Sequence, residues 1–538
     1  MSNVPESKYN IMLPLLLACT LAIGVMIGFK IGGNQNQSRL ISGFDGKYNY
    51  HPTGRVEELL RFIESKYVDS IDVDTLLDDA VYALIQNLDP HSEYLTPSEV
   101  EEINNQMEGH YRGIGIEVCM VDDTACIYKI FEASPAITSG LKTGDKIIKV
   151  NEKNIAGLSM SVSDIRQMLK VTEGNMLKLE LRRNGKKILT SLEMQEIPFS
   201  SVPCAYNVND SIMYIKVDRF ASNTYNEFME KVEKLFGKAK SKHLVIDLRG
   251  NPGGFLPEAT NILSQIFEEK NKVLVTTKSK NKQKTEYKTT GKRFFNISDV
   301  AVLVDENSAS AAELLAGALQ DWDRGLVVGR KTYGKGLVQE QYDLNNGGAI
   351  RLTVAKYFTP SGRYIQRDYS DKFQYEDEDR RRMIDGDYFK PSIPKSKKGQ
   401  ITYKSLVKGR ILPSGEGIFP DVFIPADSAY LSDVFIPLQP FFKAYFVKKM
   451  YDSTFKDLNT IEKIKAFNFS TSSFKDFLQY TGLTVLPSEN LKLMNYASRY
   501  MRVVMASALL GDEAAVRIDN QSDTAFLKTI QMLGKSDR

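Results

Sequence analysis

Apolar residues recur at helical spacing in the part of the chain that follows residue 50, and they predict helices there. The periodic positions are Val56, Leu59, Leu60 and Ile63 in one stretch and Leu77, Val81, Leu84 and Ile85 in the next. Leu88-Asp89-Pro90-His91-Ser92 interrupts the pattern and predicts a turn. We therefore assign residues 45–107 to an N-terminal helical segment.

Between residues 108 and 196 the pattern changes to that of short strands and tight turns. Strands are expected at 146–150 and 177–182, and a helix at 163–171. Asp122-Asp123 and Asn184-Gly185 are the expected turns of two hairpins. The first turn would place Cys119 opposite Cys126. Because direct cross-strand disulfides are strained, we favour two small buried thiols there.

Residues 197–370 alternate strands with helices, and two strand–loop–helix units stand out. The strand 244–248 leads into Arg249-Gly250-Asn251-Pro252-Gly253-Gly254 and an amphipathic helix. The strand 300–305 leads into Asn307-Ser308-Ala309-Ser310-Ala311-Ala312-Glu313 and a second helix. Between the two units, residues 278–293 predict an exposed hairpin decorated with lysines.

The remainder of the chain carries no chemical motif. Residues 371–400 are charged and irregular and predict an exposed insertion, and 415–427 predict a strand that returns to the core. Residues 431–538 predict a helical C-terminal extension with aromatic-rich amphipathic stretches. The sequence gives this extension no role, and docking and homodimer formation both stay open.

The N-terminus indicates a membrane anchor. Residues 11–29 carry no charge, and a polar, Gly/Asn/Gln-rich stretch follows them. A helix of that length spans about one hydrocarbon core. A cleaved signal peptide is the alternative, since Leu16-Leu17-Ala18-Cys19 resembles a lipoprotein cleavage box. We expect residues 1–35 to form a single-pass inner-membrane anchor and exit segment, with the bulk of an envelope protein in the periplasm or otherwise outside the cytoplasm.

Composition limits the class of protein. The chain has 538 residues, 42% hydrophobic and 25% charged, which is the composition of a globular protein of several domains. Its 70 basic and 67 acidic residues are too evenly balanced for a nucleic-acid-binding protein. Four cysteines without a CxxC pair, and only four histidines, argue against a structural zinc site.

Ser310 is the candidate nucleophile. It should lie in the first turn of a helix, with Asn307 or Ser308 as the N-cap, where backbone N–H groups favour negative charge. An oxyanion formed by its attack could accept a hydrogen bond from Ala311 N–H. The backbone of Gly253 and Gly254 could supply a second donor.

The candidate base is a lysine. His243 opens a buried strand, and His51, His91 and His110 are expected outside the α/β region. Lys335 lies between two glycines in Tyr333-Gly334-Lys335-Gly336. It can accept a proton only when neutral, which requires desolvation to lower its pKa.

Residues 108–196 resemble a PDZ domain. The resemblance rests on the loop Gly113-Ile114-Gly115-Ile116 and on Gly140-Leu141-Lys142-Thr143-Gly144-Asp145, in the usual order. Such modules bind an extended C-terminal peptide as an added strand and hold its carboxylate with backbone N–H groups. The resemblance implies that Gly113, Ile114, Gly115 and Ile116 form the peptide-binding loop.

Four ordered motifs resemble those of the C-terminal processing peptidases, the tail-specific Ser/Lys peptidases of family S41. They are Leu-Arg-x-Asn-Pro-Gly-Gly, Ser-Ala-Ser-Ala-Ala-Glu, Gly-Lys-Gly-x-x-Gln and Tyr-Phe-Thr-Pro-Ser-Gly, and the similarity covers about residues 50–430. It implies a multidomain α+β fold with an α/β spiral peptidase core at 197–430 and an inserted PDZ-like β domain, and it implies no metal or other cofactor.

The resemblance also assigns the site residues. Ser310 would be the nucleophile, Lys335 the general base and Gln339 the residue that orients the lysine. Ser308 is the rival nucleophile, but the family places its serine three residues before the motif glutamate, here Glu313. Ala312 stands where many relatives have serine.

The expected function is that of a membrane-anchored serine endopeptidase that cleaves proteins near their free C-termini. The alternative is a PDZ adaptor on an inactive peptidase scaffold, and another acyl-transfer enzyme is a more distant one. The sequence leaves open the substrate, a homodimer and whether the resting state is active.

Overall fold

The computed structural model describes residues 54–536, apart from 171–175, 241, 392–401, 428–433, 451–454, 456 and 484–489. The chain divides into two compact units, Met1–Asp78 and Asp79–Arg538. The anchor predicted at residues 11–29 lies outside the described residues. Within the described part, no helix is both long enough and apolar enough to cross a membrane.

The predicted N-terminal helices are present as α2 (Gly54–Lys66) and α3 (Val73–Ile85), and neither buries a residue. The elements that follow, up to residue 198, are β1 (Glu93–Leu95), α4 (Pro97–Glu108), β2 (His110–Gly113), β3 (Ile116–Val121), β4 (Thr124–Ile130), α5 (Pro135–Thr138), β5 (Lys146–Val150), β6 (Lys153–Asn154), α6 (Val162–Leu169), β7 (Met176–Arg183), β8 (Lys186–Glu193) and β9 (Gln195–Pro198). The strand β1 follows the predicted turn at residues 88–92, in a stretch that was predicted to be helical.

Both hairpin turns are confirmed. Asp122-Asp123 joins β3 to β4 and Asn184-Gly185 joins β7 to β8, each pair with positive φ at both residues. This conformation matches the twist of the two strands. Cys119 faces Cys126 in the register, and both are buried free thiols, as expected. The strand order β3-β4-β5-β7-β8 leaves β3 at the edge of this sheet.

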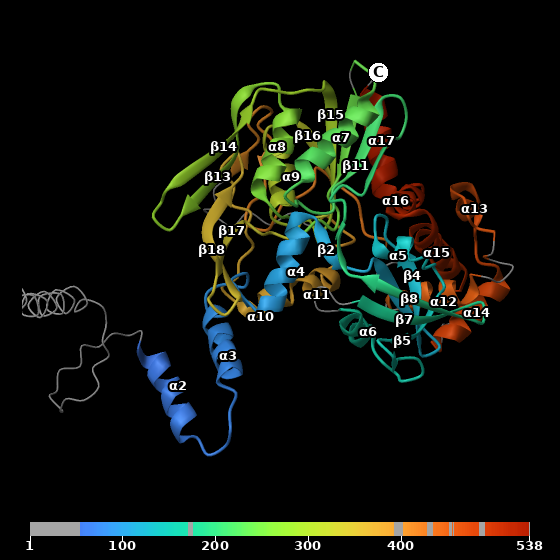
Figure 1. Cartoon of the computed structure of the whole chain (residues 1–538). Coiled ribbons are helices and arrows are strands. Elements are labelled where there is room, and N and C mark those ends of the chain that lie inside the picture. The colour runs from blue at the N-terminus through green and yellow to red at the C-terminus, as the bar shows by residue number, and fades with distance from the viewer. Residues whose placement is uncertain are drawn as a thin grey trace, which may run out of the picture. The chain divides into compact units, whose positions relative to one another are not determined.

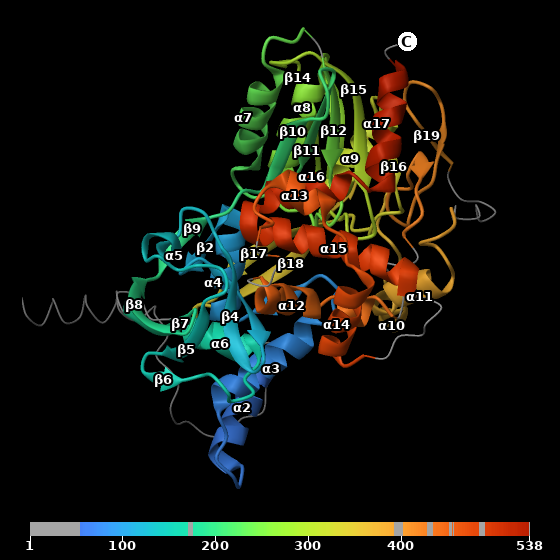
Figure 2. The ribbon, with the colours of Figure 1, turned by 90° about the vertical axis from the view of Figure 1, so that its right-hand side faces the viewer.

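A six-stranded sheet, β10-β11-β12-β15-β16-β21, forms the centre of the second unit, and it is parallel except for β10 (Figure 2). Its strands are β10 (Cys204–Asn207), β11 (Ile212–Lys216), β12 (Lys242–Asp247), β15 (Ile297–Val304), β16 (Gly325–Gly329) and β21 (Val422–Phe423). The helices beside it are α7 (Thr224–Phe236), α8 (Leu256–Ile266), α9 (Ala311–Asp321) and α17 (Thr524–Ser536).

Apolar residues on both faces of this sheet explain why it is covered on both sides. Leu244 and Ile246 belong to one buried cluster with α8 and α9. Val245, between them, belongs to a second cluster with Phe526 of α17. Since side chains alternate along a strand, a near-continuous apolar run requires a layer on each face.

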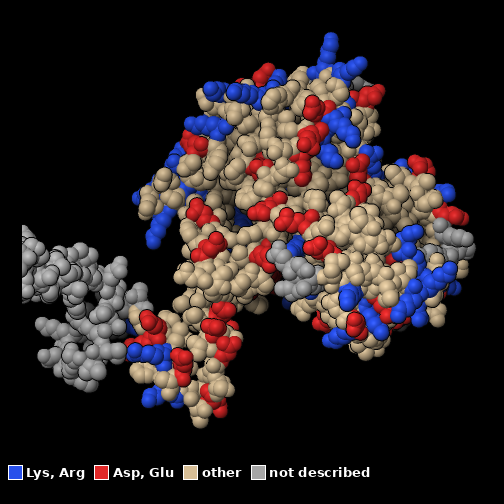
Figure 3. All heavy atoms as spheres, viewed as in Figure 1, with Lys and Arg blue, Asp and Glu red and all other residues tan. Residues whose placement is uncertain are grey.

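A second sheet pairs β18 (Ala349–Phe358) with β1, β13 (Lys270–Ser279) and β17 (Leu337–Asp343), and β13 with β14 (Lys284–Thr290). The β13–β14 hairpin confirms the lysine-decorated hairpin predicted near residues 278–293. Figure 3 shows Lys and Arg side chains along the edge of the second unit where Figure 1 places β13 and β14.

The prediction that residues 371–400 form an exposed, irregular insertion is partly wrong. It holds α10 (Lys372–Glu376) and α11 (Glu378–Ile384) and is followed by β19 (Tyr403–Lys404) and β20 (Ile411–Leu412). Tyr375, Arg382 and Tyr388 are buried. Arg382 donates to the carbonyl of Lys331 at 2.7 Å, so a charged residue is buried here because backbone oxygens accept from it.

The C-terminal extension is helical, as predicted. Besides α17 it contains η1 (Ile436–Leu438), α12 (Phe441–Lys449), α13 (Ile461–Ala466), α14 (Thr471–Thr481), α15 (Asn490–Leu510) and α16 (Asp512–Asn520). Its aromatic core packs against Cys119, Val121, Cys126 and Tyr128 of β3 and β4. The mixed α+β architecture expected from the sequence is confirmed.

Candidate active site

Two loops meet at the carboxyl edge of the central sheet. β12 and β15 are parallel neighbours, so the loops that follow them leave the sheet on the same side. Ala309 N–H donates to the carbonyl of Asn251 at 2.9 Å, and Gly250 N–H donates to Asp305 Oδ1 at 2.9 Å. The glycine-rich loop and the start of α9 therefore lie against each other.

Ser310 occupies the N-cap position of α9, not its first turn, and the predicted caps Asn307 and Ser308 are wrong. Its φ of 54° and ψ of −116° are strained for a non-glycine residue. Its N–H donates to the side chain of Glu313 at 2.9 Å. Ser308 is fully buried and donates to the carbonyl of Leu248, whereas Ser310 is half-buried.

Of the predicted oxyanion residues, Gly253 and Ala311 lie close to Ser310, whereas Gly254 packs elsewhere. A Cβ on Gly253 would lie 2.7 Å from Ser310 Cβ and 3.0 Å from Ala311 N, which shows how closely the two backbones approach. Gly253 N–H donates to Asn251 Oδ1 at 2.8 Å and would have to leave this acceptor to bind an oxyanion. Gly254, with φ of 137°, packs on the backbone of Phe220.

Gly253→Ala is expected to destabilise the fold by about 3 kcal/mol, since it combines left-handed strain with overlap against Ser310 and Ala309. Gly250→Ala is the matched control. Gly250 also has positive φ, but its Cβ would meet nothing within 4 Å, so only about 1 kcal/mol is expected. Urea unfolding measures both, and equal losses would contradict the close approach.

Lys335 lies in the loop before β17. Its Nζ donates to Gln339 Oε1 at 2.7 Å, and its N–H donates to Glu313 Oε2 at 2.8 Å. Burial lowers the pKa of Lys335, and the charge of Arg351 lowers it further. Within the described residues, no hydrogen bond joins Ser310 Oγ to Lys335 Nζ in this conformation.

His91 is the site residue that the sequence missed, because it was expected outside the α/β region. Its carbonyl accepts from Gln339 Nε2, and its Nε2 lies 2.6 Å from the hydroxyl of Tyr375. Burial, and next the charge of Lys335, lower the pKa of His91 to about 4, so the ring is neutral at pH 7. The turn Leu88–Ser92 was the signal that could have found it.

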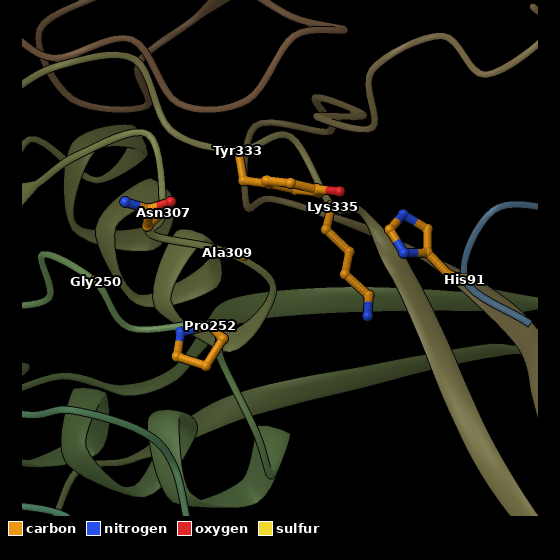
Figure 4. Close-up of a pocket in the computed structure, with 7 residues that line it drawn as sticks. All are labelled: His91, Gly250, Pro252, Asn307, Ala309, Tyr333 and Lys335. Atoms are coloured by element: carbon orange, nitrogen blue, oxygen red, sulfur yellow. The ribbon is translucent and has the colours of Figure 1, made fainter. Parts of the chain in front are cut away.

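A pocket of about 520 Å³ lies beside these groups, and it is lined by His91, Gly250, Pro252, Asn307, Ala309, Tyr333 and Lys335. Figure 4 shows the Lys335 side chain between Tyr333 and His91, with Pro252 and Asn307 across the pocket. In the described part of the chain, no three His, Cys, Asp or Glu side chains gather so as to hold a metal ion.

The predicted peptide-binding loop lies at the start of the edge strand β3. Gly113 ends β2, Ile114 and Gly115 are buried, and Ile116 begins β3. A Cβ on Gly115, whose φ is 82°, would lie 2.1 Å from Ser134 Cβ, so this position requires glycine. Among the described strands, β3 pairs with β4 alone, which leaves an edge that an extended peptide can join.

Comparison with known proteins identifies the family. Residues 211–371 match peptidase family S41, and residues 113–194 match the PDZ domain. The chain is 31% identical over 361 residues to the carboxy-terminal processing protease CtpA of Bacillus subtilis, covering 67% of this chain and 74% of the relative. It is 31% identical over 320 residues to CtpB of the same organism, covering 58% of this chain and 65% of the relative.

Two further likenesses are more limited in length or similarity. A probable CtpA-like serine protease of Staphylococcus aureus is 32% identical over 329 residues, covering 60% of this chain and 64% of the relative. The solved structure of the photosystem II D1 C-terminal processing protease is 23% identical with a TM-score of 0.36, and the match covers 69% of this chain and 88% of the other. The CtpA relative is more than 30% identical and is covered over 74% of its length, and this chain also matches the PDZ domain, so the chain belongs to peptidase family S41, among its PDZ-bearing carboxy-terminal processing serine proteases.

Proposed function

We propose that this chain is an endopeptidase that cleaves proteins near their C-termini with Ser310 as nucleophile and Lys335 as general base. The observation that carries the proposal is a half-buried lysine of lowered pKa in a pocket that Pro252 of the glycine-rich loop and Ala309, next to Ser310, also line. A lysine in such surroundings can be neutral near physiological pH and can accept the proton of a serine hydroxyl.

The reaction takes two steps. Neutral Lys335 takes the Ser310 proton while Oγ bonds to the peptide carbonyl carbon, and the resulting ammonium protonates the leaving amine as the C–N bond breaks. A water molecule then gives a proton to Lys335 as its oxygen bonds to the acyl carbon, and the ammonium returns a proton to Ser310 Oγ as the ester C–O bond breaks. For the first step, the Lys335 amine must turn from Gln339 Oε1 toward Ser310. The hydrogen bond to Gln339 fixes the position from which the lysine amine starts this movement.

We assign the oxyanion donors to Gly254, Ala311 and Gly253 backbone N–H groups. Ala311 N–H is at the N-terminus of α9, where the helix dipole favours developing negative charge. Gly253 N–H joins only after release from Asn251, so substrate binding would complete the site.

We also propose that the PDZ domain binds the substrate tail along β3, with the free carboxylate on the Gly113–Ile116 loop. Charged hydrogen bonds of this kind contribute about 1.5–3 kcal/mol, so an amidated tail should lose about tenfold or more in kcat/KM. The measurement compares one unfolded reporter with an apolar tail as free acid and as amide. Equal rates for the two would remove the tail-recognition part of the proposal.

The location proposed is the bacterial envelope. It rests on the charge-free residues 11–29, and on relatives that are bacterial processing proteases. Membrane fractionation of the full chain, compared with a form starting at Gly43, tests the anchor.

A homodimer is a second proposal. Apolar side chains of α2, among them Val56, Leu59 and Phe62, are exposed and would suit contact with a second copy of the chain. Sedimentation of the shorter form tests whether it dimerises.

Cleavage by the form starting at Gly43 tests the activity itself. The expected result is endoproteolysis of the unfolded reporter, lost in Ser310→Ala. If the free-acid tail binds but nothing is cut, the chain is the PDZ adaptor instead.

A further inference from the structure

Glu313 is a fully buried carboxylate that joins the two halves of the proposed catalytic pair. Its Oε2 accepts from Ser310 N–H at 2.9 Å and from Lys335 N–H at 2.8 Å. Its Oε1 accepts from Gly334 N–H at 2.7 Å and from the hydroxyl of Thr332. One side chain on α9 therefore fixes both the strained serine and the loop that carries the lysine.

Tyr357 of β18 makes a second connection between the two residues, through their carbonyl groups. Its hydroxyl lies 2.9 Å from the carbonyl oxygen of Ser310 and 2.5 Å from that of Lys335. The ring is 2% exposed and packs in the main core, so the hydroxyl has little freedom to move. Glu313 accepts the N–H groups of Ser310 and Lys335, and Tyr357 bonds their carbonyls.

This double connection matters because Ser310 has an unfavourable backbone conformation. A non-glycine residue at φ of 54° and ψ of −116° persists only where its surroundings hold it. Serine and lysine come from different loops, 25 residues apart in sequence. Proton transfer between them depends on their relative placement to a fraction of an ångström.

We propose that Glu313 and Tyr357 are positioning residues that hold the backbones of Ser310 and Lys335 together for proton transfer, and that Glu313 does so only in its ionised form. The inference rests on the Ser/Lys function proposed above. Neither side chain touches the substrate in this assignment, and both act through the peptide groups of the catalytic pair.

The requirement for ionisation follows from counting donors. Four donors converge on the two carboxylate oxygens, and a proton on either oxygen would add a fifth. The Thr332 hydroxyl, which accepts from Ile418 N–H at 2.7 Å, could take a proton on Oε1 only by giving up its own donation to that oxygen. A proton on Oε2 would displace the N–H of Ser310 or of Lys335, since both partners of that oxygen are donors. Protonation therefore costs at least one of the four bonds that the carboxylate accepts.

The surroundings of Glu313 place its titration near neutral pH. Burial raises the pKa of Glu313 to about 7, against the effect of its four donors. The titratable groups that sense its charge are Lys335 from the adjacent loop and Tyr357 from β18. Arg382 reaches the same loop through backbone carbonyls, and the neighbours on α8 and β16 are apolar. Activity should thus rise with pH through about 7.

The test compares Glu313→Gln and Tyr357→Phe with the unmutated chain in kcat, KM and pH–rate profile. Since both Glu313 and Lys335 must lose a proton, log(kcat/KM) should rise with a slope of two at acid pH. Glu313→Gln should lower kcat about 100-fold at unchanged KM and reduce that slope to one. Tyr357→Phe, which removes a hydroxyl that does not titrate there, should lower kcat about tenfold and keep the slope of two.

An infrared measurement keeps the inference separate from the proposed function. In a Ser310→Ala background, lowering the pH from about 8 to about 6 should produce the band of a buried protonated carboxyl, absent when Glu313→Gln is added. Failure of the unmutated chain to cleave would contradict the proposed function. Absence of the band, or a Glu313→Gln enzyme within threefold of normal kcat with an unchanged slope, would overturn the inference.

Discussion

Ser310→Ala should lower kcat/KM for an unfolded reporter with a free C-terminus by about 10⁴-fold or more. Without Oγ no acyl-enzyme can form, and the remaining oxyanion donors stabilise only a slow attack by water. The fold should survive, because Ser310 is half-buried and the bonds to Glu313 and Tyr357 use its backbone. Initial rates, together with urea unfolding of both proteins, measure the effect.

Ser308→Ala is the matched control, because Ser308 is the rival nucleophile two residues away. Its hydroxyl donates to Leu248 at 2.8 Å and accepts from Asp305 N–H at 2.9 Å, so its loss should cost about 1–2 kcal/mol of stability. The folded enzyme should nevertheless keep kcat within a few-fold. The assignment of the nucleophile fails if Ser310→Ala still cuts, or if a folded Ser308→Ala does not.

Local sequence rules were sufficient where the structure depends on neighbouring residues. The two-residue turns at 122–123 and 184–185 were predictable because short polar residues and glycine accept positive φ between strands. The strand 146–150 was predicted with its exact bounds for a similar reason, since its apolar pattern has few alternatives.

The start of α9 was mispredicted because a tertiary contact occupies Ser308 and because the local capping box of Ser310 and Glu313 was overlooked. By propensity, Asn307 or Ser308 should cap the helix. In the structure Ser308 bonds to Leu248, and Ser310 is held at the N-cap by Glu313 while Gly253 packs against its Cβ. Leu248 and Gly253 cannot be identified from a local window of sequence, whereas Glu313, three residues after Ser310, completes a capping box that local sequence could have revealed.

His91 and the insertion were missed for reasons of distance along the chain. β1 pairs with β18 more than 250 residues later, and this pairing belongs to the sheet in which Gln339 lies. The insertion is rich in charge and therefore reads as exposed. Its Tyr375 and Arg382 are nevertheless buried, bonded to His91 and to the carbonyl of Lys331 beside the pocket. Charge alone does not report which residues have buried acceptors.

Lys335→Met should lower kcat/KM about 10³-fold, since a positioned general base contributes about 10²–10⁴-fold. The unmutated enzyme should gain activity with rising pH as Lys335 loses its proton, because only the neutral amine can accept one. Burial has lowered the pKa of this lysine, so the gain comes at a lower pH than for an exposed lysine. Lys335→Met should lose this gain and keep only the slope of one that the ionisation of Glu313 gives. Its urea midpoint should not fall, because a neutral side chain is cheaper to bury.

Lys335→Arg separates a base from a fixed positive charge. A guanidinium has nearly the same charge and reach, but it stays protonated at every pH at which the protein is folded. If Lys335 acts as the base, Lys335→Arg should be as inactive as Lys335→Met while remaining folded. If instead the lysine only stabilises the oxyanion by its charge, Lys335→Arg should keep substantial activity and the pH dependence should reverse, because the charged form would then be the active one. Such a result would mean that the general base is another group beside Ser310.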